Sequence, residues 1–175
     1  MADETSPHDD LNDLLSRITL ILQQPIDFRR TDPATPRAKV RLLTAAAHYF
    51  NILAVTDYGG RVGSVRDEGF VEQAVAAAFE TFEGVDPHPS PFEKAAMLFR
   101  GITQGHRFTD GNKRTGFLLA SYYLSQVYAP APPTLPIDQV EALCIRVSAG
   151  QLRDVTAIAA ELERLWSTYS EVPER

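Results

Sequence analysis

A histidine, an aspartate and two cations occur within nine residues, in the segment His106–Arg114. His106 is a base that can work near neutral pH and take a proton from an attacking hydroxyl group. Asp110 offers a hard carboxylate oxygen, and Mg²⁺ is commonly shared between one carboxylate and the phosphates of a substrate. Lys113 and Arg114 add positive charge beside them. This combination indicates chemistry on a substrate that carries phosphate.

The same residues lie in a short loop, Gly105–Gly111, that opens directly into a predicted helix from Asn112 to Tyr128. The first N–H groups of a helix have no partner within it, and the helix dipole places partial positive charge there, so an anion binds well. Gly111 allows the backbone to approach a ligand closely. Acidic residues are normally favoured in a first helical turn, so the cations Lys113 and Arg114 suggest that a bound anion compensates them.

Each of these residues also has an ordinary structural interpretation. Asp110 suits the N-cap of a helix, and a single histidine in a loop is often only hydrogen-bonded or solvated. Lys113 and Arg114 suit a solvated helix face, and Phe108 suits a core anchor under either interpretation. The residues alone leave both interpretations open, and the coincidence of all of them in one loop favours phosphate chemistry.

The elements that must position this loop are helices. Apolar side chains recur with helical spacing along most of the chain, and no segment has a convincing strand pattern. The expected helices cover about residues 10–24, 36–53, 70–82, 92–104, 112–128, 138–149 and 153–169. The pattern predicts an all-α, single-domain bundle of about seven helices. The glycine-rich segment Asp57–Gly69 is predicted to be a loop or a short β-hairpin, because paired glycines permit tight turns.

Composition and charge restrict the classes of function. Of the 175 residues, 44% are hydrophobic and 23% are charged, which is an ordinary globular mixture. The net charge of −6 disfavours a protein that binds the nucleic-acid backbone, since that mode needs a basic face. The polar, acidic start of the sequence and the lack of an apolar run of about 18 residues predict no signal peptide, no membrane segment and a cytoplasmic location.

Two residues that often carry chemistry are expected to be structural here. Cys144 is the one cysteine of the chain, so an internal disulfide and a cysteine-based zinc site are excluded. It lies in an apolar run, Val140–Val147, where a buried and inert thiol is expected. His48 lies beside an apolar helix face, where a core histidine is favoured over a neighbour of an active site.

The segment HRFTDGNKRTG, His106–Gly116, resembles the signature of the Fic/Doc (Fido) family, H-x-F-x-[DE]-G-N-[GK]-R. It is most similar to the Doc branch, the death-on-curing toxins, because Lys113 stands where AMP-transferring Fic proteins have glycine. The run Tyr58–Gly69 resembles the glycine-rich flap of Doc-like proteins. The resemblance extends over about residues 40–169, so we expect a catalytic domain at 40–175 and an added helix and linker at 1–39.

The resemblance implies an all-α Fido fold and transfer of part of ATP to a protein hydroxyl group. It makes His106 the general base, Asp110 the ligand of Mg²⁺, and Phe108 the structural anchor of the loop. The residues that would bind the nucleotide are Gly111, Asn112, Lys113 and Arg114. The residues of the flap that would hold the target segment by strand-like pairing are Gly59, Gly60, Arg61, Val62, Gly63 and Ser64.

The group that is transferred depends on two positions. AMP-transferring Fic proteins have a second arginine where this chain has Phe117, and they have glycine where it has Lys113. In Doc-like proteins this combination goes with reversed nucleotide placement and transfer of the γ-phosphate to a translation factor of the elongation factor Tu type. The resemblance therefore favours phosphorylation. The alternatives are AMP transfer to a protein, transfer to a small-molecule hydroxyl group, and a non-catalytic binding domain.

The Doc branch also implies a toxin that is paired with an antitoxin. Many Fic proteins carry an inhibitory helix with the pattern [ST]-x-x-x-E-[GN]. Ser64–Gly69 matches this pattern but lies in the expected flap, so we interpret the match as chance. Inhibition is therefore expected to come from a separate antitoxin protein.

Overall fold

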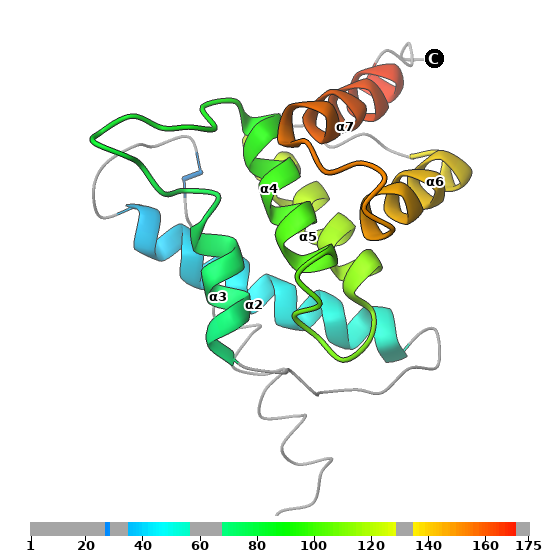
Figure 1. The fold of residues 1–175 in the computed structure, drawn as a ribbon, viewed down its shortest axis with the longest axis horizontal. Coiled ribbons are helices and arrows are strands. Elements are labelled where there is room, and N and C mark those ends of the chain that lie inside the picture. The colour runs from blue at the N-terminus through cyan, green and yellow to red at the C-terminus, as the bar shows by residue number, and fades with distance from the viewer. Residues whose placement is uncertain (1–26, 29–34, 57–67, 129–134, 171–175) are drawn as a thin grey trace, which may run out of the picture.

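The structure, a computed structural model, describes residues 27–28, 35–56, 68–128 and 135–170. These residues form six helices, with a single isolated β-bridge between Phe82 and Val85 (Figure 1). The helices are α2 (Thr35–Thr56), α3 (Glu68–Ala76), α4 (Pro91–Thr103), α5 (Asn112–Val127), α6 (Ile137–Ser148) and α7 (Val155–Ser170). The predicted all-α class is confirmed. The predicted helix at 10–24 and the predicted flap Gly59–Ser64 lie outside the described residues.

Helix α4 is the centre of the bundle and packs against α3, α5, α6 and α7. Its start is fixed by a capping box: the Ser90 side chain accepts a hydrogen bond from a first-turn N–H, and Glu93 accepts one from the Ser90 N–H at 3.2 Å. Most of its apolar side chains are buried, because neighbours cover it on several sides. The end of this central helix therefore positions the loop that follows.

Helices α4 and α5 form an antiparallel pair joined by the short loop 104–111, seen at the lower end of the pair in Figure 1. Gly116 permits the close contact between them: a Cβ atom there would lie 2.8 Å from the Phe99 carbonyl oxygen. The rings of Phe99 and Phe117 meet edge to face, 5.9 Å apart. The glycine and the aromatic pair thus hold the start of α5 against the end of α4.

Helix α2 contacts both α3 and α5, and its C-terminal end lies beside the α4–α5 loop (Figure 1). Its core face includes Leu42, Leu43 and Ala46, all of which are buried. The polar residue Asn51, near the C-terminal end of the same helix, is also buried, at 4% exposure. A buried polar side chain needs hydrogen-bond partners, and those of Asn51 belong to the α4–α5 loop and to the first turn of α5.

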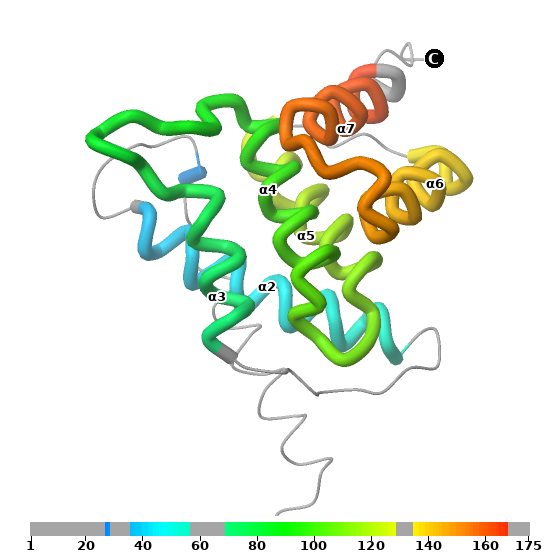
Figure 2. Tube along the Cα trace, in the orientation of Figure 1, coloured from blue at the N-terminus to red at the C-terminus, as the bar shows by residue number. Residues whose placement is uncertain are grey.

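The prediction that the third helix extends to Phe82 is wrong. Helix α3 ends at Ala76, after which hydrogen bonds from Ala78 N–H to Val75 and from Phe79 N–H to Ala76 tighten the turn. Lys94 Nζ, from α4, donates to the Ala78 carbonyl at 3.4 Å. This tertiary contact satisfies a carbonyl in the turn that directly follows the helix. Figure 2 shows that the connection 77–90 extends outward from the bundle and then returns to the start of α4.

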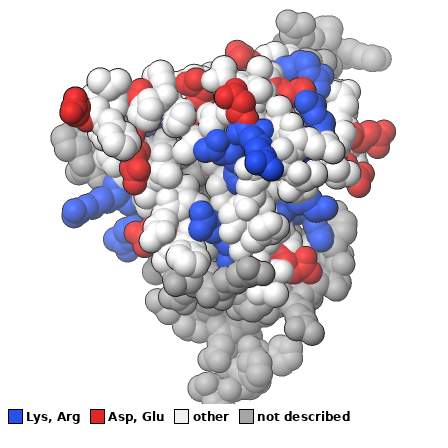
Figure 3. Space-filling view, in the orientation of Figure 1, with Lys and Arg blue, Asp and Glu red and all other residues white. Residues whose placement is uncertain are grey.

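Helices α6 and α7 complete the bundle on the other side of α4. Cys144, on α6, is 8% exposed, and burial raises the pKa of its thiol to about 12, so the expected burial of this thiol is confirmed. Within the described residues, no helix combines the length and apolar character needed to cross a membrane. Figure 3 shows Lys and Arg side chains interspersed with Asp and Glu, with one group of cations near the centre of this face. The surface therefore has a local positive region although the net charge of the chain is negative.

Candidate functional site

The side chain of Asn112 closes the turn at the end of the loop between α4 and α5. Asn112 Oδ1 accepts a hydrogen bond from the Phe108 N–H at 2.8 Å, and Asn112 Nδ2 donates to the Phe108 carbonyl at 2.7 Å. The amide of Asn112 therefore pairs with both backbone groups of a residue four positions earlier. This double contact fixes the shape of the turn 108–112.

Phe108 fixes the same turn to the core. Its ring is 2% exposed and meets the half-buried ring of His48 edge to face, with centroids 5.5 Å apart. His106 and Asp110, two residues before and two after it, are exposed. His106 has a positive φ of 47°, a backbone conformation that few residues other than glycine adopt. The loop thus presents a base and a carboxylate to solvent from a buried anchor.

Asn51 holds the loop from a different helix, and our sequence analysis missed it. Its Nδ2 donates to the backbone carbonyl of Asp110 at 2.8 Å and to Thr115 Oγ1 at 3.1 Å. Both Asn51 and Thr115 are buried. The asparagine itself stands out in the sequence, because it interrupts the apolar pattern of a helix. Its partners lie 59 and 64 positions away, and nothing in the sequence connects them to it. Asn51 thereby fixes the backbone that carries the Asp110 carboxylate.

The start of α5 is open to an anion. Its N-cap is Gly111, with φ of 76°, no side chain caps the helix, and no acidic residue lies in its first turn. The alternative that Asp110 is the N-cap is wrong, since its Oδ1 accepts the Gly111 N–H at 2.6 Å. A Cβ atom at position 111 would lie 3.0 Å from both Asn51 Nδ2 and Val55 Cγ2. Both the backbone angle and the lack of space therefore require glycine there.

The two cations at this helix start differ in how they are held. Arg114 Nη1 donates to the Ala54 carbonyl at 2.5 Å, which places its guanidinium group at the C-terminal end of α2. Lys113 is exposed. The structure thus brings both cations to the same end of α5 as Gly111, where an anion would also meet the N–H groups of the first turn.

Asp110 is the one sequence-predicted metal ligand. Among the described residues there is no group of three or more His, Cys, Asp or Glu side chains that could hold a metal ion. Mg²⁺ does not need such a cage, since it keeps several waters and is often held by one carboxylate together with substrate phosphates. An exposed Asp110 beside an anion site fits that kind of binding.

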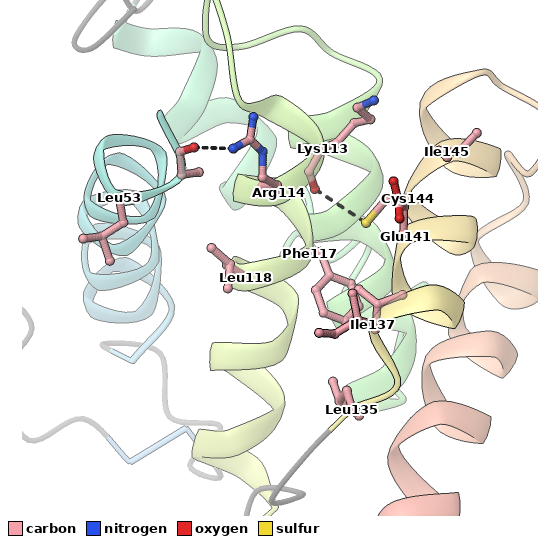
Figure 4. A pocket seen from close by; sticks show the side chains of 12 residues that line it. Leu53, Lys113, Arg114, Phe117, Leu118, Leu135, Ile137, Glu141, Cys144 and Ile145 are labelled. Carbon is pink, nitrogen blue, oxygen red and sulfur yellow. Dashed lines mark hydrogen bonds between the residues drawn. The ribbon is translucent and has the colours of Figure 1, made fainter. Parts of the chain in front are cut away.

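A pocket of about 800 Å³ begins at the same helix start and extends toward α6 (Figure 4). Helices α2, α5 and α6 form its walls. The lining residues are Leu53, Ala54, Lys113, Arg114, Phe117, Leu118, Leu135, Ile137, Val140, Glu141, Cys144 and Ile145. The lining is mainly apolar, with cations toward one end and the carboxylate of Glu141 on the α6 wall (Figure 4).

Comparison with known proteins finds a family whose matched residues include this loop. Residues 42–124 match the model of the Fic/DOC family. The protein named Toxin Doc, from Mycolicibacterium smegmatis (strain ATCC 700084 / mc(2)155), is 35% identical to the chain over 105 residues, which is 60% of this chain and 79% of the relative. No solved structure matches the chain significantly.

Proposed function

The chain belongs to the Fic/Doc family, and from this premise we propose that it transfers the γ-phosphate of ATP to a hydroxyl group of a protein. Four observations support transfer at the α4–α5 loop. His106 and Asp110 are exposed there, Gly111 leaves the start of α5 uncapped, and two cations lie in the first turn. Phosphoryl transfer depends mostly on positioning and on neutralising charge, and these groups supply both.

In the proposed reaction, each group has one task. His106 takes the proton from the attacking hydroxyl group, whose oxygen then bonds to the transferred phosphorus. Asp110 would hold Mg²⁺, which neutralises phosphate charge when bound. The first-turn N–H groups of Asn112 and Lys113 would bind phosphate oxygens, and Gly111 would let the nucleotide approach the backbone closely. Arg114 would add positive charge, and ADP leaves.

The single observation that favours phosphate over AMP transfer is the side chain at position 117. Phe117 is buried and packs edge to face on Phe99, so it places an apolar ring where AMP-transferring relatives have arginine. No charge is then available at this position to hold the β- and γ-phosphates of an AMP donor. Lys113, where those relatives have glycine, adds bulk and charge at the helix start.

The proposed biological role is that of a toxin whose inhibitor is a separate antitoxin protein. It is supported by the relative named Toxin Doc. The proposed acceptor is a translation factor of the elongation factor Tu type in the cytoplasm. The segment Gly59–Ser64, outside the described residues, is proposed to hold the target by backbone pairing.

The test uses ATP labelled at the α- or the γ-phosphate, with purified protein, Mg²⁺ and bacterial lysate. We expect label on a protein band from γ-labelled ATP and none from α-labelled ATP. His106→Ala protein in the same lysate is the control for kinases of the lysate. Label that arrives from α-labelled ATP and depends on His106 would establish AMP transfer instead. Label from neither nucleotide would contradict transfer from ATP altogether.

A further inference from the structure

Three arginines come together around the end of α4. Arg100, in the last turn of this helix, donates from Nη1 to the backbone carbonyl of Arg153 at 3.0 Å, so the segment before α7 lies against α4. Arg107, in the α4–α5 loop, donates from Nε to the carbonyl of Gly101, the residue after Arg100, at 3.2 Å. Figure 3 shows a group of Lys and Arg side chains near the centre of the face that is drawn. We call the side chains of Arg100, Arg107 and Arg153 the arginine surface.

None of these three arginines forms an ion pair with an acid in the part of the chain that the structure describes. The ion pairs there are those of Lys94 with Asp86, and of Arg146 and Arg164 with Glu161. Asp154 directly follows Arg153, but its Oδ1 accepts the Ala157 N–H at 2.8 Å in the first turn of α7. Cations held together repel one another, so an acidic group from outside the chain would stabilise this surface.

The fold uses only part of the hydrogen-bonding capacity of these side chains. A guanidinium group has five N–H donors, and each of the three arginines uses one of them for a backbone carbonyl. Arg100 also contacts Met97 Sδ through Nη2, at 3.4 Å. Because these contacts already hold the side chains, less conformational entropy is lost when a ligand binds. A carboxylate can accept two parallel N–H bonds from one guanidinium group, so the surface fits Asp and Glu side chains.

The arginine surface adjoins the catalytic loop. Arg107 lies between the exposed His106 and the buried anchor Phe108. Its guanidinium group also lies over the ring of Phe70, in the first turn of α3, at 5.7 Å from the ring centroid. The end of α4 and the start of α3 therefore both hold Arg107. A protein whose hydroxyl group reaches His106 would lie over this part of the surface.

We propose that the arginine surface binds an acidic segment of the acceptor protein and thereby selects the hydroxyl group that reaches His106. The proposal rests on the proposed function, because it assumes that the acceptor is a protein. It names the substrate class: a protein with several Asp or Glu side chains near the hydroxyl group that is modified. The three arginines determine specificity, and the chemistry stays with His106 and Asp110.

The competing polyanion is a nucleic acid. Binding of that kind gains affinity with each phosphate that a cation neutralises, so it needs an extended basic face. A surface of three arginines on a chain with a net charge of −6 offers few such contacts. An acidic protein segment is therefore the better match.

The first experiment measures binding of a short, fluorescent polyglutamate peptide without ATP. Arg153→Glu reverses one exposed charge of the arginine surface, and Arg41→Glu makes the same change at an exposed position of α2. We expect wild-type protein and Arg41→Glu to bind the peptide alike and Arg153→Glu to bind it about tenfold more weakly. Equal binding by the two variants would overturn the proposal. Polythymidylate of the same length that binds more tightly than the peptide, and that depends on Arg153, would assign the surface to nucleic acid instead.

A second variant tests the same surface from α4 and guards against a loss of folding. Arg100→Gln removes one charge and should weaken binding of the peptide by about threefold. The thermal unfolding midpoint of each variant is measured on the same preparation. Folded Arg100→Gln and Arg153→Glu proteins that both bind the peptide as the wild type does would exclude a site for acidic segments.

The second experiment follows transfer from γ-labelled ATP as the concentration of lysate is raised, with His106→Ala as the blank. In Arg153→Glu, half-maximal labelling should require about tenfold more lysate than in Arg41→Glu, because the acceptor binds more weakly. The affinity for ATP with Mg²⁺, measured by calorimetry, should be the same in both variants. The polyglutamate peptide should inhibit labelling by Arg41→Glu about tenfold more effectively than labelling by Arg153→Glu.

The outcomes separate this proposal from the proposed function. Half-maximal labelling at the same lysate concentration in Arg153→Glu and Arg41→Glu would overturn the acceptor role of the surface and leave the proposed function standing. A wild-type protein that transfers nothing, yet binds the polyglutamate peptide in a way that depends on Arg153, would overturn the proposed function and leave a binding site for acidic protein segments.

Discussion

Two connections between helices both contain residues with positive φ angles, but different contacts stabilise them. The α3–α4 connection, 77–90, has positive φ angles at Glu83 and Gly84, and the α4–α5 loop has them at His106 and Gly111. The first turn is closed by its own backbone, with hydrogen bonds of 2.9 and 2.8 Å between Phe82 and Val85. The second is closed by side chains from outside it, Asn112 on α5 and Asn51 on α2.

Their apolar residues differ in the same way. Phe82 is 74% exposed at the first turn, whereas Phe108 is 2% exposed at the second. Where the backbone itself stabilises a turn, substitution of its side chains should change the stability of the fold only slightly. A turn held by the core keeps exposed groups such as His106 and Asp110 in fixed positions, which catalysis requires.

The largest expected effect on stability comes from truncating the two phenylalanines. Phe108→Ala should lower the free energy of unfolding by about 3 kcal/mol or more, because it removes a buried ring. Phe82→Ala should change it by less than about 0.5 kcal/mol, since the ring is exposed. Urea denaturation of both variants measures the difference. Equal losses would show that the two turns depend on the core alike.

The glycines provide a second, smaller contrast. Gly84→Ala should cost about 1 kcal/mol from its positive φ alone, because nothing lies within 4 Å of a Cβ atom there. Gly111→Ala should cost about 2–3 kcal/mol, since its Cβ atom would also crowd Asn51 and Val55. Thermal unfolding of the pair tests this ordering. A larger loss in Gly84→Ala would contradict the packing described at the start of α5.

A third contrast separates positioning from folding. Asn51→Ala should lower stability by about 1–2 kcal/mol and also slow transfer, because the Asp110 carbonyl loses its partner. Thr115→Val is the control, since it removes the other partner and keeps the contact between Asn51 and Asp110. Transfer rates at saturating ATP and Mg²⁺ compare the two. Equal slowing in both variants would show that Asn51 acts only through general stability.

The sequence predicted most helices because their apolar periodicity is local. The third helix was an exception: the run of alanines continues past Ala76, but the helix ends there, and the turn that follows is held by a contact from Lys94 of α4 to Ala78. At the site, the spacing from His106 to Arg114 was sufficient to locate the loop, because these residues are neighbours in the chain. Asn51 and the α6 wall with Glu141 were not predictable in this way, since only the tertiary packing brings them to the start of α5.

The central claim is that the α4–α5 loop is a catalytic centre that the core holds in place. Its most direct test is the His106→Ala protein, with transfer from γ-labelled ATP and the free energy of unfolding measured on the same preparation. We expect transfer to fall by roughly 10²–10⁴-fold, because the general base is lost. Stability should change by less than about 1 kcal/mol, since the side chain is exposed. A folded His106→Ala protein that transfers label at close to the wild-type rate would contradict the claim.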